Sequence, residues 1–147
     1  MIPTISVFLD VDALGNTKLK DFEHCDISQV VLVFLTKGFF NSGPCAREIV
    51  RAVLRKKPII ACLETDQGKT KGGLTEEQCR SIIADPKPDG TTWFTEPKYR
   101  AGATFYLTDQ AREWAKDWGQ SDIKVPTSQE VADAVFANPP INWYRSA

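Results

Sequence analysis

The stretch NSGPCAREIV, residues 41–50, decides the fold, because it marks the change from a strand to a helix. Upstream of it, QVVLVFLT at residues 29–36 is an almost unbroken run of apolar and β-branched residues, typical of a parallel strand buried on both faces. Downstream, Ser42 or Gly43 can cap a helix whose first position is Pro44, where a missing N–H is no loss. The sequence therefore predicts a strand over 30–35 and a helix over 44–56.

The predicted helix carries one carboxylate in its first half, Glu48. At about 100° per residue, the apolar residues share one face, and Arg47, Arg51 and Arg55 share the opposite face, so Glu48 lies on the border. Ligands of open α/β sheets bind at the carboxyl ends of strands and at the first turns of the following helices. Glu48 is therefore a candidate to face a cleft. The alternative is a solvated residue paired with Arg51 at i+3, worth roughly a few tenths of a kcal/mol.

The composition is that of one soluble globular domain, with 147 residues, 42% of them hydrophobic and 25% charged. A formal net charge of −1 gives no reason to expect nucleic acid or an anionic membrane as a partner. No window reaches the roughly 18 apolar residues that a membrane span needs, and no secretory leader is visible. We therefore expect a cytoplasmic protein without membrane or nucleic-acid partners.

The four cysteines show no C-x-x-C spacing and fit buried thiols in a reducing compartment. His24 is the only histidine, which argues against a zinc site and against any catalytic Ser-His-Asp or Cys-His pair not built on it. Asp10 and Asp12 follow a short strand predicted at ISVFL, residues 5–9, but no third metal ligand lies nearby. We expect no metal site.

Further along the chain, a short helix is predicted over 18–25 and a third strand over 58–63. The resulting β-α-β-α-β order predicts a parallel sheet with right-handed crossovers. Beyond it, the glycine-rich segment 66–73 lacks a phosphate-binding pattern and is interpreted as a flexible linker. The remaining expected elements are helices over 75–84, 109–118 and 128–138, a loop over 85–99, and strands over 104–107 and 141–144. Trp114 and Trp118 are interpreted as packing residues.

Four blocks carry a resemblance: ISVFLDVDAL (5–14), QVVLVFLTKGFFNS (29–42), CAREIVRAV (45–53) and KPIIACLE (57–64) resemble successive blocks of a Toll/interleukin-1 receptor (TIR) domain. The C-x-x-E-[IL] element is the most specific of them, and INW at 141–143 resembles a later strand. The resemblance implies an α/β fold with a flavodoxin-like parallel sheet. A single TIR-like domain over 1–147 is expected, with its core in 1–66, a long variable insertion in 67–140 and the last strand in 141–147. The family's first strand and helix and its last helix have no counterpart, so the fold is expected to be incomplete or modified at both ends.

The resemblance also implies a function, because many TIR domains cleave the bond between nicotinamide and ribose in NAD+. Glu48 matches their catalytic glutamate. Ser42 and Cys45, which lie six and three positions before it, are candidate substrate-binding residues. Asp10 matches a loop that borders the substrate, and Leu19 falls where an aromatic residue can lie near it. NAD+ would be substrate, not cofactor, and ADP-ribose or cyclic ADP-ribose would be the product. The implied role is immune or cell-death signalling, with self-association through TIR-to-TIR contacts.

Three alternatives remain open. Pro44 stands where plant and animal members often carry Trp, which favours a non-catalytic TIR module that signals by self-association. A nucleoside deoxyribosyltransferase-like enzyme has a related α/β fold and also uses a glutamate. A structural α/β fragment without activity is the third alternative.

Overall fold

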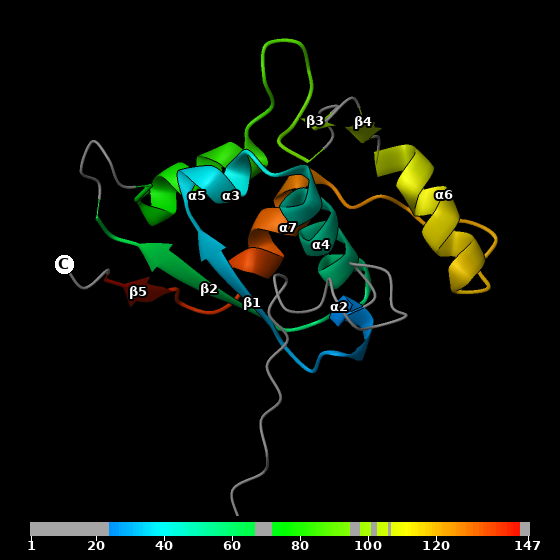
Figure 1. The fold of residues 1–147 in the computed structure, drawn as a ribbon, viewed down its shortest axis with the longest axis horizontal. Coiled ribbons are helices and arrows are strands. Elements are labelled where there is room, and N and C mark those ends of the chain that lie inside the picture. Colours follow the sequence, from blue (N-terminus) through cyan, green and yellow to red (C-terminus); the bar gives the residue numbers. More distant parts are fainter. Residues whose placement is uncertain (1–23, 67–71, 95–97, 101–102, 106, 145–147) are drawn as a thin grey trace, which may run out of the picture.

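The chain folds as an α/β protein around a three-stranded parallel sheet (Figure 1). The computed structural model describes residues 24–66, 72–94, 98–100, 103–105 and 107–144. The main sheet holds β1 (Val31–Leu35), β2 (Ile59–Glu64) and β5 (Ile141–Trp143) in the order β1-β2-β5. The helices are α2 (His24–Ile27), α3 (Lys37–Phe40), α4 (Gly43–Leu54), α5 (Glu76–Ala84), α6 (Leu107–Asp117) and α7 (Ser128–Val135).

The order of the strands is compatible with a flavodoxin-like fold. Val31 pairs with Ile59 and Leu35 with Leu63, so β1 and β2 run in parallel over their whole shared length. β5 adds to the other side of β2, with Cys62 opposite Ile141. The strands thus follow the chain order across the sheet, which is the arrangement that successive crossovers of one hand produce.

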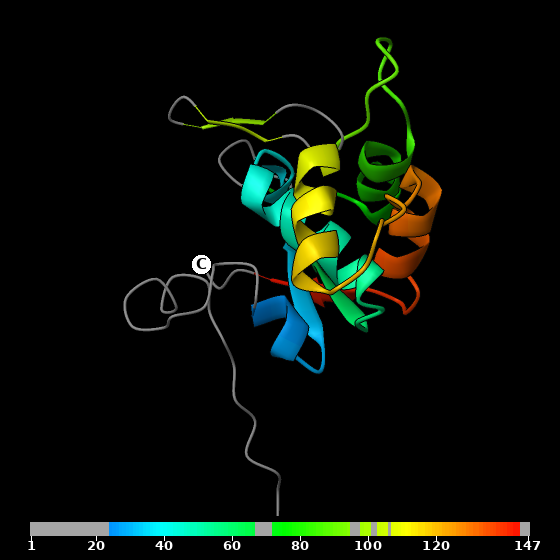
Figure 2. The ribbon, with the colours of Figure 1, turned by 90° about the vertical axis from the view of Figure 1, so that its right-hand side faces the viewer.

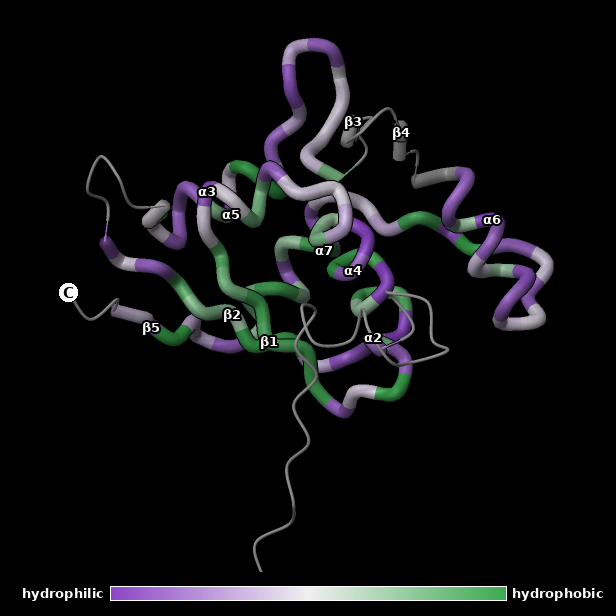
Figure 3. Tube along the Cα trace, viewed as in Figure 1, coloured by the Kyte–Doolittle hydropathy of each residue, from purple (hydrophilic) through white to green (hydrophobic). Residues whose placement is uncertain are grey.

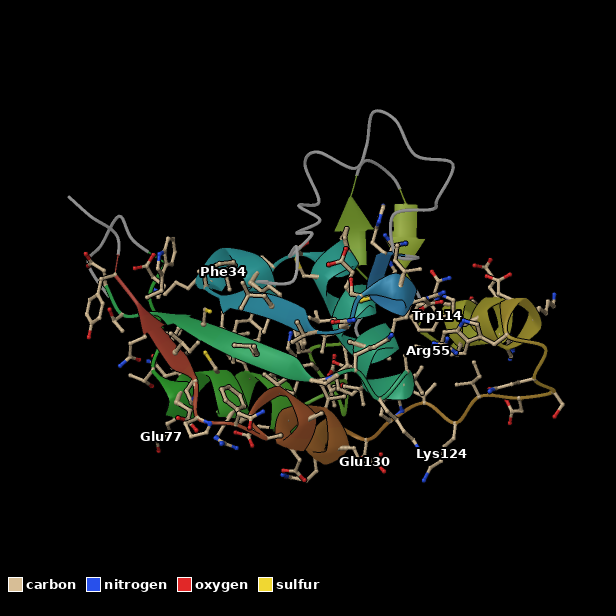
Figure 4. All side chains as sticks on the ribbon, turned by 90° about the horizontal axis from the view of Figure 1, so that it is seen from below. Phe34, Arg55, Glu77, Trp114, Lys124 and Glu130 are labelled. Carbon is tan, nitrogen blue, oxygen red and sulfur yellow. The ribbon has the colours of Figure 1, made fainter. Side chains whose placement is uncertain are left out.

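The helices α5 and α7 lie together on one face of the sheet (Figures 2 and 4), and α7 packs against β2 and α4. The buried residues of α4, among them Ile49 and Val50, belong to the same core as Val33 and Leu35 of β1. Figure 3 shows that hydrophobic residues are concentrated along β1 and β2. The core therefore lies between this face of the sheet and the three helices.

On the opposite face of the sheet, the outer strands β1 and β5 expose apolar side chains, whereas Cys62 and Glu64 of β2 are buried there. Alternate side chains of a strand point to opposite faces, and Leu32 is 51% and Phe34 44% exposed. The expectation that β1 is buried on both faces was therefore wrong. Ile141 and Trp143 of β5 lie on the same open side, where the Phe34 and Trp143 rings meet edge to face at 5.4 Å. We call these four residues the open sheet face.

The ends of the helices follow local signals in the sequence. The Ser42 hydroxyl accepts a hydrogen bond from the N–H of Cys45 at 3.4 Å, so Ser42 is the N-cap of α4. Thr75 and Thr127 each form a capping box, at the starts of α5 and α7. The predicted helices over 44–56, 75–84 and 128–138 are thus confirmed to within a few residues. The short helix α3 was not predicted.

The segment between β2 and β5 docks on α4 through a cluster around Arg51. Arg51 is 1% exposed and donates to both carboxylate oxygens of Asp26 on α2, at 2.9 and 2.6 Å. Its guanidinium lies 5.2 Å from the ring centre of Trp114 and 4.9 Å from that of Trp118, and the two rings are stacked. Figure 4 shows Arg55 and Trp114 between α4 and α6. The side of α4 that carries Arg51 and Arg55, opposite its apolar face, is therefore an interface with α2 and α6.

The carboxyl group of Asp26 is ionised within this cluster. Its partial burial acts to raise its pKa, but the hydrogen bonds and positive charge of Arg51, helped by the indole N–H of Trp118, outweigh this effect and lower the pKa. Lys57 adds to the cluster by donating to the backbone carbonyls of Asp26 and Ser28, at 2.7 and 2.9 Å. The cluster thus fixes both α2 and α6 against α4.

The end of the glycine-rich segment is held by backbone hydrogen bonds at Gly72 and Gly73. Residues 67–71 lie outside the described part, so their interpretation as a flexible linker stays a prediction. The carbonyl of Gly72 accepts from the N–H of Lys37 at 2.9 Å, and Gly73 donates to Asp66 at 3.0 Å. A Cβ atom on Gly73 would lie 2.3 Å from the carbonyl oxygen of Asp66. Only glycine fits this close backbone approach.

The strand predicted over 104–107 forms β4 (Ala103–Phe105), but it does not join the main sheet. It pairs antiparallel with β3 (Lys98–Arg100), a strand that the sequence did not predict. Across the residues that the structure describes, no helix combines the length and the apolar character needed to cross a membrane.

Candidate functional site

Three of the five predicted site residues lie on one turn-and-helix unit at the carboxyl end of β1. The chain leaves β1 at Leu35, forms α3, and enters α4 at its N-cap, Ser42. Cys45 is half-buried in the first turn of α4, and its N–H is the group that Ser42 binds. Glu48 follows one turn later, on the same side of the helix as Cys45. The sequence thus brings Ser42, Cys45 and Glu48 together through local structure alone.

Glu48 is half-buried, on the flank of α4 that packs against α2. Its backbone carbonyl accepts a hydrogen bond from the Cys25 thiol at 3.6 Å. Burial raises the pKa of this thiol to about 11, and the negative charges of Glu48 and Asp26 act in the same direction. Because the thiol stays protonated near neutral pH, Cys25 serves as a packing residue and weak donor, not as a nucleophile.

The remaining two predicted site residues, Asp10 and Leu19, lie outside the described residues, as does the predicted strand over 5–9. The structure therefore does not say whether Asp10 and Leu19 lie near Glu48.

A hollow of about 590 Å³ lies beside this unit, between α3, the C-terminal end of α5 and the loop that follows α5. Its lining includes Lys37, Asn41, Leu74, Asp85, Lys87 and Trp93. The walls are held by hydrogen bonds, since the indole N–H of Trp93 donates to the carbonyl of Phe40 at 2.8 Å and Leu74 donates to Glu64 at 3.2 Å. None of Ser42, Cys45 and Glu48 lines this hollow.

Sequence reasoning missed this hollow, although one signal pointed to its position. Lys37 and Asn41 stand at the two ends of α3, the short helix that follows the carboxyl end of β1, where α/β sheets bind ligands. The opposite wall comes from the loop after α5, and no local pattern relates residues 85–93 to residues 37–41. The lining combines the buried ring of Trp93 with the charged side chains of Lys37, Asp85 and Lys87.

Within the described residues, no group of three or more His, Cys, Asp or Glu side chains is placed to hold a metal ion. The four cysteines, all within the described residues, form no disulfide. Burial raises the pKa of the Cys79 thiol to about 12, with a smaller contribution from Glu76, and burial also raises the pKa of Cys62.

Comparison with known proteins gives no match: no protein-family model, no curated protein and no solved structure matches this chain. The function must therefore be argued from the residues and their arrangement.

Proposed function

We propose that this chain is a TIR-type enzyme that cleaves the bond between nicotinamide and ribose in NAD+. The observation that carries the proposal is the placement of Glu48, a half-buried carboxylate in the helix that follows the carboxyl end of β1. The TIR assignment itself rests on the four sequence blocks, and the parallel order β1-β2-β5 is compatible with the flavodoxin-like sheet that they imply. The proposed setting is cytoplasmic immune or cell-death signalling.

The reaction needs little from the protein beyond one carboxylate. Nicotinamide leaves as a neutral molecule from a cationic substrate, so no general acid is needed to protonate it. The remaining ribosyl centre resembles an oxocarbenium ion, and the Glu48 carboxylate would stabilise its positive charge or hold the ribose hydroxyls. Attack by water then gives ADP-ribose, and attack by a group within the same molecule gives a cyclic product. Ser42 and Cys45 would contact the substrate one turn before Glu48.

Glu48→Gln is expected to lower NAD+ cleavage at least ~100-fold, because glutamine keeps the shape of the side chain but removes its charge at the reacting centre. The measurement is chromatography of nicotinamide and ADP-ribose products formed by concentrated purified protein. Glu77→Gln is the matched control, since Glu77 is exposed on α5, away from α4, and should retain full turnover (Figure 4). Equal turnover in both variants, or no turnover in the unmodified chain at any concentration, contradicts the proposal.

A second candidate function, assembly without catalysis, is favoured by the open sheet face. Exposed contiguous apolar side chains on a small protein often mark an interaction surface. Leu32 and Phe34 of β1 and Ile141 and Trp143 of β5 are between 37% and 55% exposed, on the two strands that flank β2. A self-associating module would bury them between copies.

Phe34→Asp is expected to abolish concentration-dependent self-association in sedimentation velocity, because a carboxylate at the centre of a buried apolar contact is strongly unfavourable. Ile27→Asp is the control, since Ile27 is 57% exposed on α2 and does not belong to the open sheet face. Assembly that persists in Phe34→Asp, or a chain that is monomeric throughout, argues against this second function.

A further inference from the structure

The outer edge of β1 presents backbone groups that the described part of the chain does not pair. The N–H of Val31 donates toward β2, to the carbonyl of Pro58 at 2.9 Å. Alternate residues of a strand direct their backbone groups to opposite neighbours, so the N–H and C=O groups of Leu32 and Phe34 point away from β2. Among the described residues, β1 has β2 as its one strand neighbour. Such an edge can accept a further strand.

The crossovers already in the structure fix the direction in which the sheet grows. The chain passes from β1 through α4 to β2, and from β2 through α5 and α7 to β5. These helices lie on one face, and the strand order β1-β2-β5 follows the chain. Crossovers between parallel strands are almost always right-handed. When the crossover helices lie on the same face, each new strand is therefore added on the same side of the preceding strand.

The helix that leads into β1 also lies on this face. Cys25 of α2 donates to the carbonyl of Glu48, and Asp26 of α2 binds Arg51, so α2 packs against α4. A crossover that arrives through α2 therefore starts from a strand on the side of β1 that faces away from β2. This side is the outer edge of β1.

We propose that Ile5–Leu9 pairs in parallel with the outer edge of β1 and extends the sheet to four strands. This segment reads ISVFL and has the same five-residue length as β1. Residues 10–30 separate it from β1, which exceeds the dozen or so residues that a parallel crossover needs. This inference does not depend on the proposed function.

The pairing has a consequence for the candidate site. The carboxyl end of the added strand lies at the same edge of the sheet as the carboxyl end of β1, because the two run in parallel. Asp10 follows Leu9 directly, so the pairing brings Asp10 to the edge where β1 continues toward Ser42. Asp10 and Ser42 are 32 positions apart in the sequence, and the proposed pairing is what brings them to one edge of the sheet.

The direct test is NMR on the full chain labelled with nitrogen-15 and carbon-13. Scalar couplings through hydrogen bonds are expected between the amides of Leu32 and Phe34 and carbonyls of residues 5–9. Both amides should exchange with solvent at least ~100-fold more slowly than in an unfolded chain. Fast exchange of both amides, with no such coupling, overturns the proposal. A sample that mixes chains labelled only with nitrogen-15 and chains labelled only with carbon-13 tests whether the paired strand comes from a second copy. Couplings between the two kinds of chain would show pairing between copies and would also overturn the proposal.

Variants supply an independent test. Val7→Pro and Phe8→Pro each remove one backbone N–H. In the proposed pairing only alternate N–H groups of the added strand face β1. One of the two variants should therefore reduce the protection of the Leu32 and Phe34 amides from exchange far more than the other. The amide of Cys79, which donates to Thr75 at 3.0 Å within α5, reports whether the rest of the fold persists. Asn16→Pro is the control outside Ile5–Leu9 and should leave all three amides unchanged. Protection of Leu32 and Phe34 that survives both strand variants contradicts the proposal.

Discussion

Arg51→Met is expected to lower the free energy of unfolding by about 3 kcal/mol, because it removes one member of a buried ion pair. Methionine replaces the apolar part of the arginine side chain, but it leaves the Asp26 carboxylate without the guanidinium that donates to both of its oxygens. The groups that remain near the carboxylate of Asp26 are the Arg55 guanidinium at 3.7 Å and the indole N–H of Trp118 at 3.3 Å. The contacts of the guanidinium with the rings of Trp114 and Trp118 are lost as well. Urea denaturation, monitored by circular dichroism, measures the change.

Arg112→Met is the matched control for this prediction. Arg112 pairs with Asp109 three residues away on α6, and both side chains are well exposed, at 76% and 66%. Exposed pairs of this kind contribute roughly 0–1 kcal/mol, so the control should stay close to the unmodified chain. If Arg51→Met costs no more than Arg112→Met, the cluster does not hold α2 and α6 on α4. In the double variant Asp26→Asn with Arg51→Met, part of the loss should be recovered, because no carboxylate is left without its partner.

Trp114→Ala is expected to cost about 4 kcal/mol, since the whole indole ring is buried and its removal leaves a cavity. The stacked ring of Trp118 and the guanidinium of Arg51 both lose a packing surface. The midpoint of urea denaturation should fall accordingly.

Trp143→Ala is the comparison, because it deletes the same side chain from an exposed position. Trp143 is 37% exposed on β5, whereas Trp114 is 0% exposed. The loss should therefore be clearly smaller than for Trp114→Ala. Equal losses would mean that α6 contributes no more to stability than the edge of the sheet.

The elements that the sequence predicted are those whose signals are local. Ser42 and Thr75 cap helices, as their neighbours in sequence indicated, and the apolar runs over 30–35 and 58–63 form paired strands. INW at 141–143 forms the last strand of the sheet, after the long segment that was expected before it. Helix caps and periodic apolar patterns are set by residues a few positions apart. They can therefore be recognised without knowing which other elements pack against them.

The features that the sequence did not predict depend on partners far away in the chain. The periodicity of α4 gives Arg51 a polar side, but it cannot show that α2 and α6 cover that side. Leu32 and Phe34 are as apolar as Val33 and Leu35, so composition could not show that one face of β1 is open. For the candidate site, the local unit of Ser42, Cys45 and Glu48 followed from sequence, whereas the neighbouring hollow did not, because its walls come from separate segments.

The position of β5 bears on how the chain reaches its native state. β1 and β2 are joined by residues 36–58, whereas β5 reaches β2 only after residues 65–140 have been placed. The entropy of closing a loop grows with its length, and each doubling costs about 0.6 kcal/mol more. Pairing of β1 with β2 can therefore precede pairing of β2 with β5, and in the interval the second edge of β2 is uncovered. During synthesis on the ribosome, this edge of β2 stays uncovered until residue 143 has emerged, and an uncovered strand edge makes a nascent chain prone to aggregation.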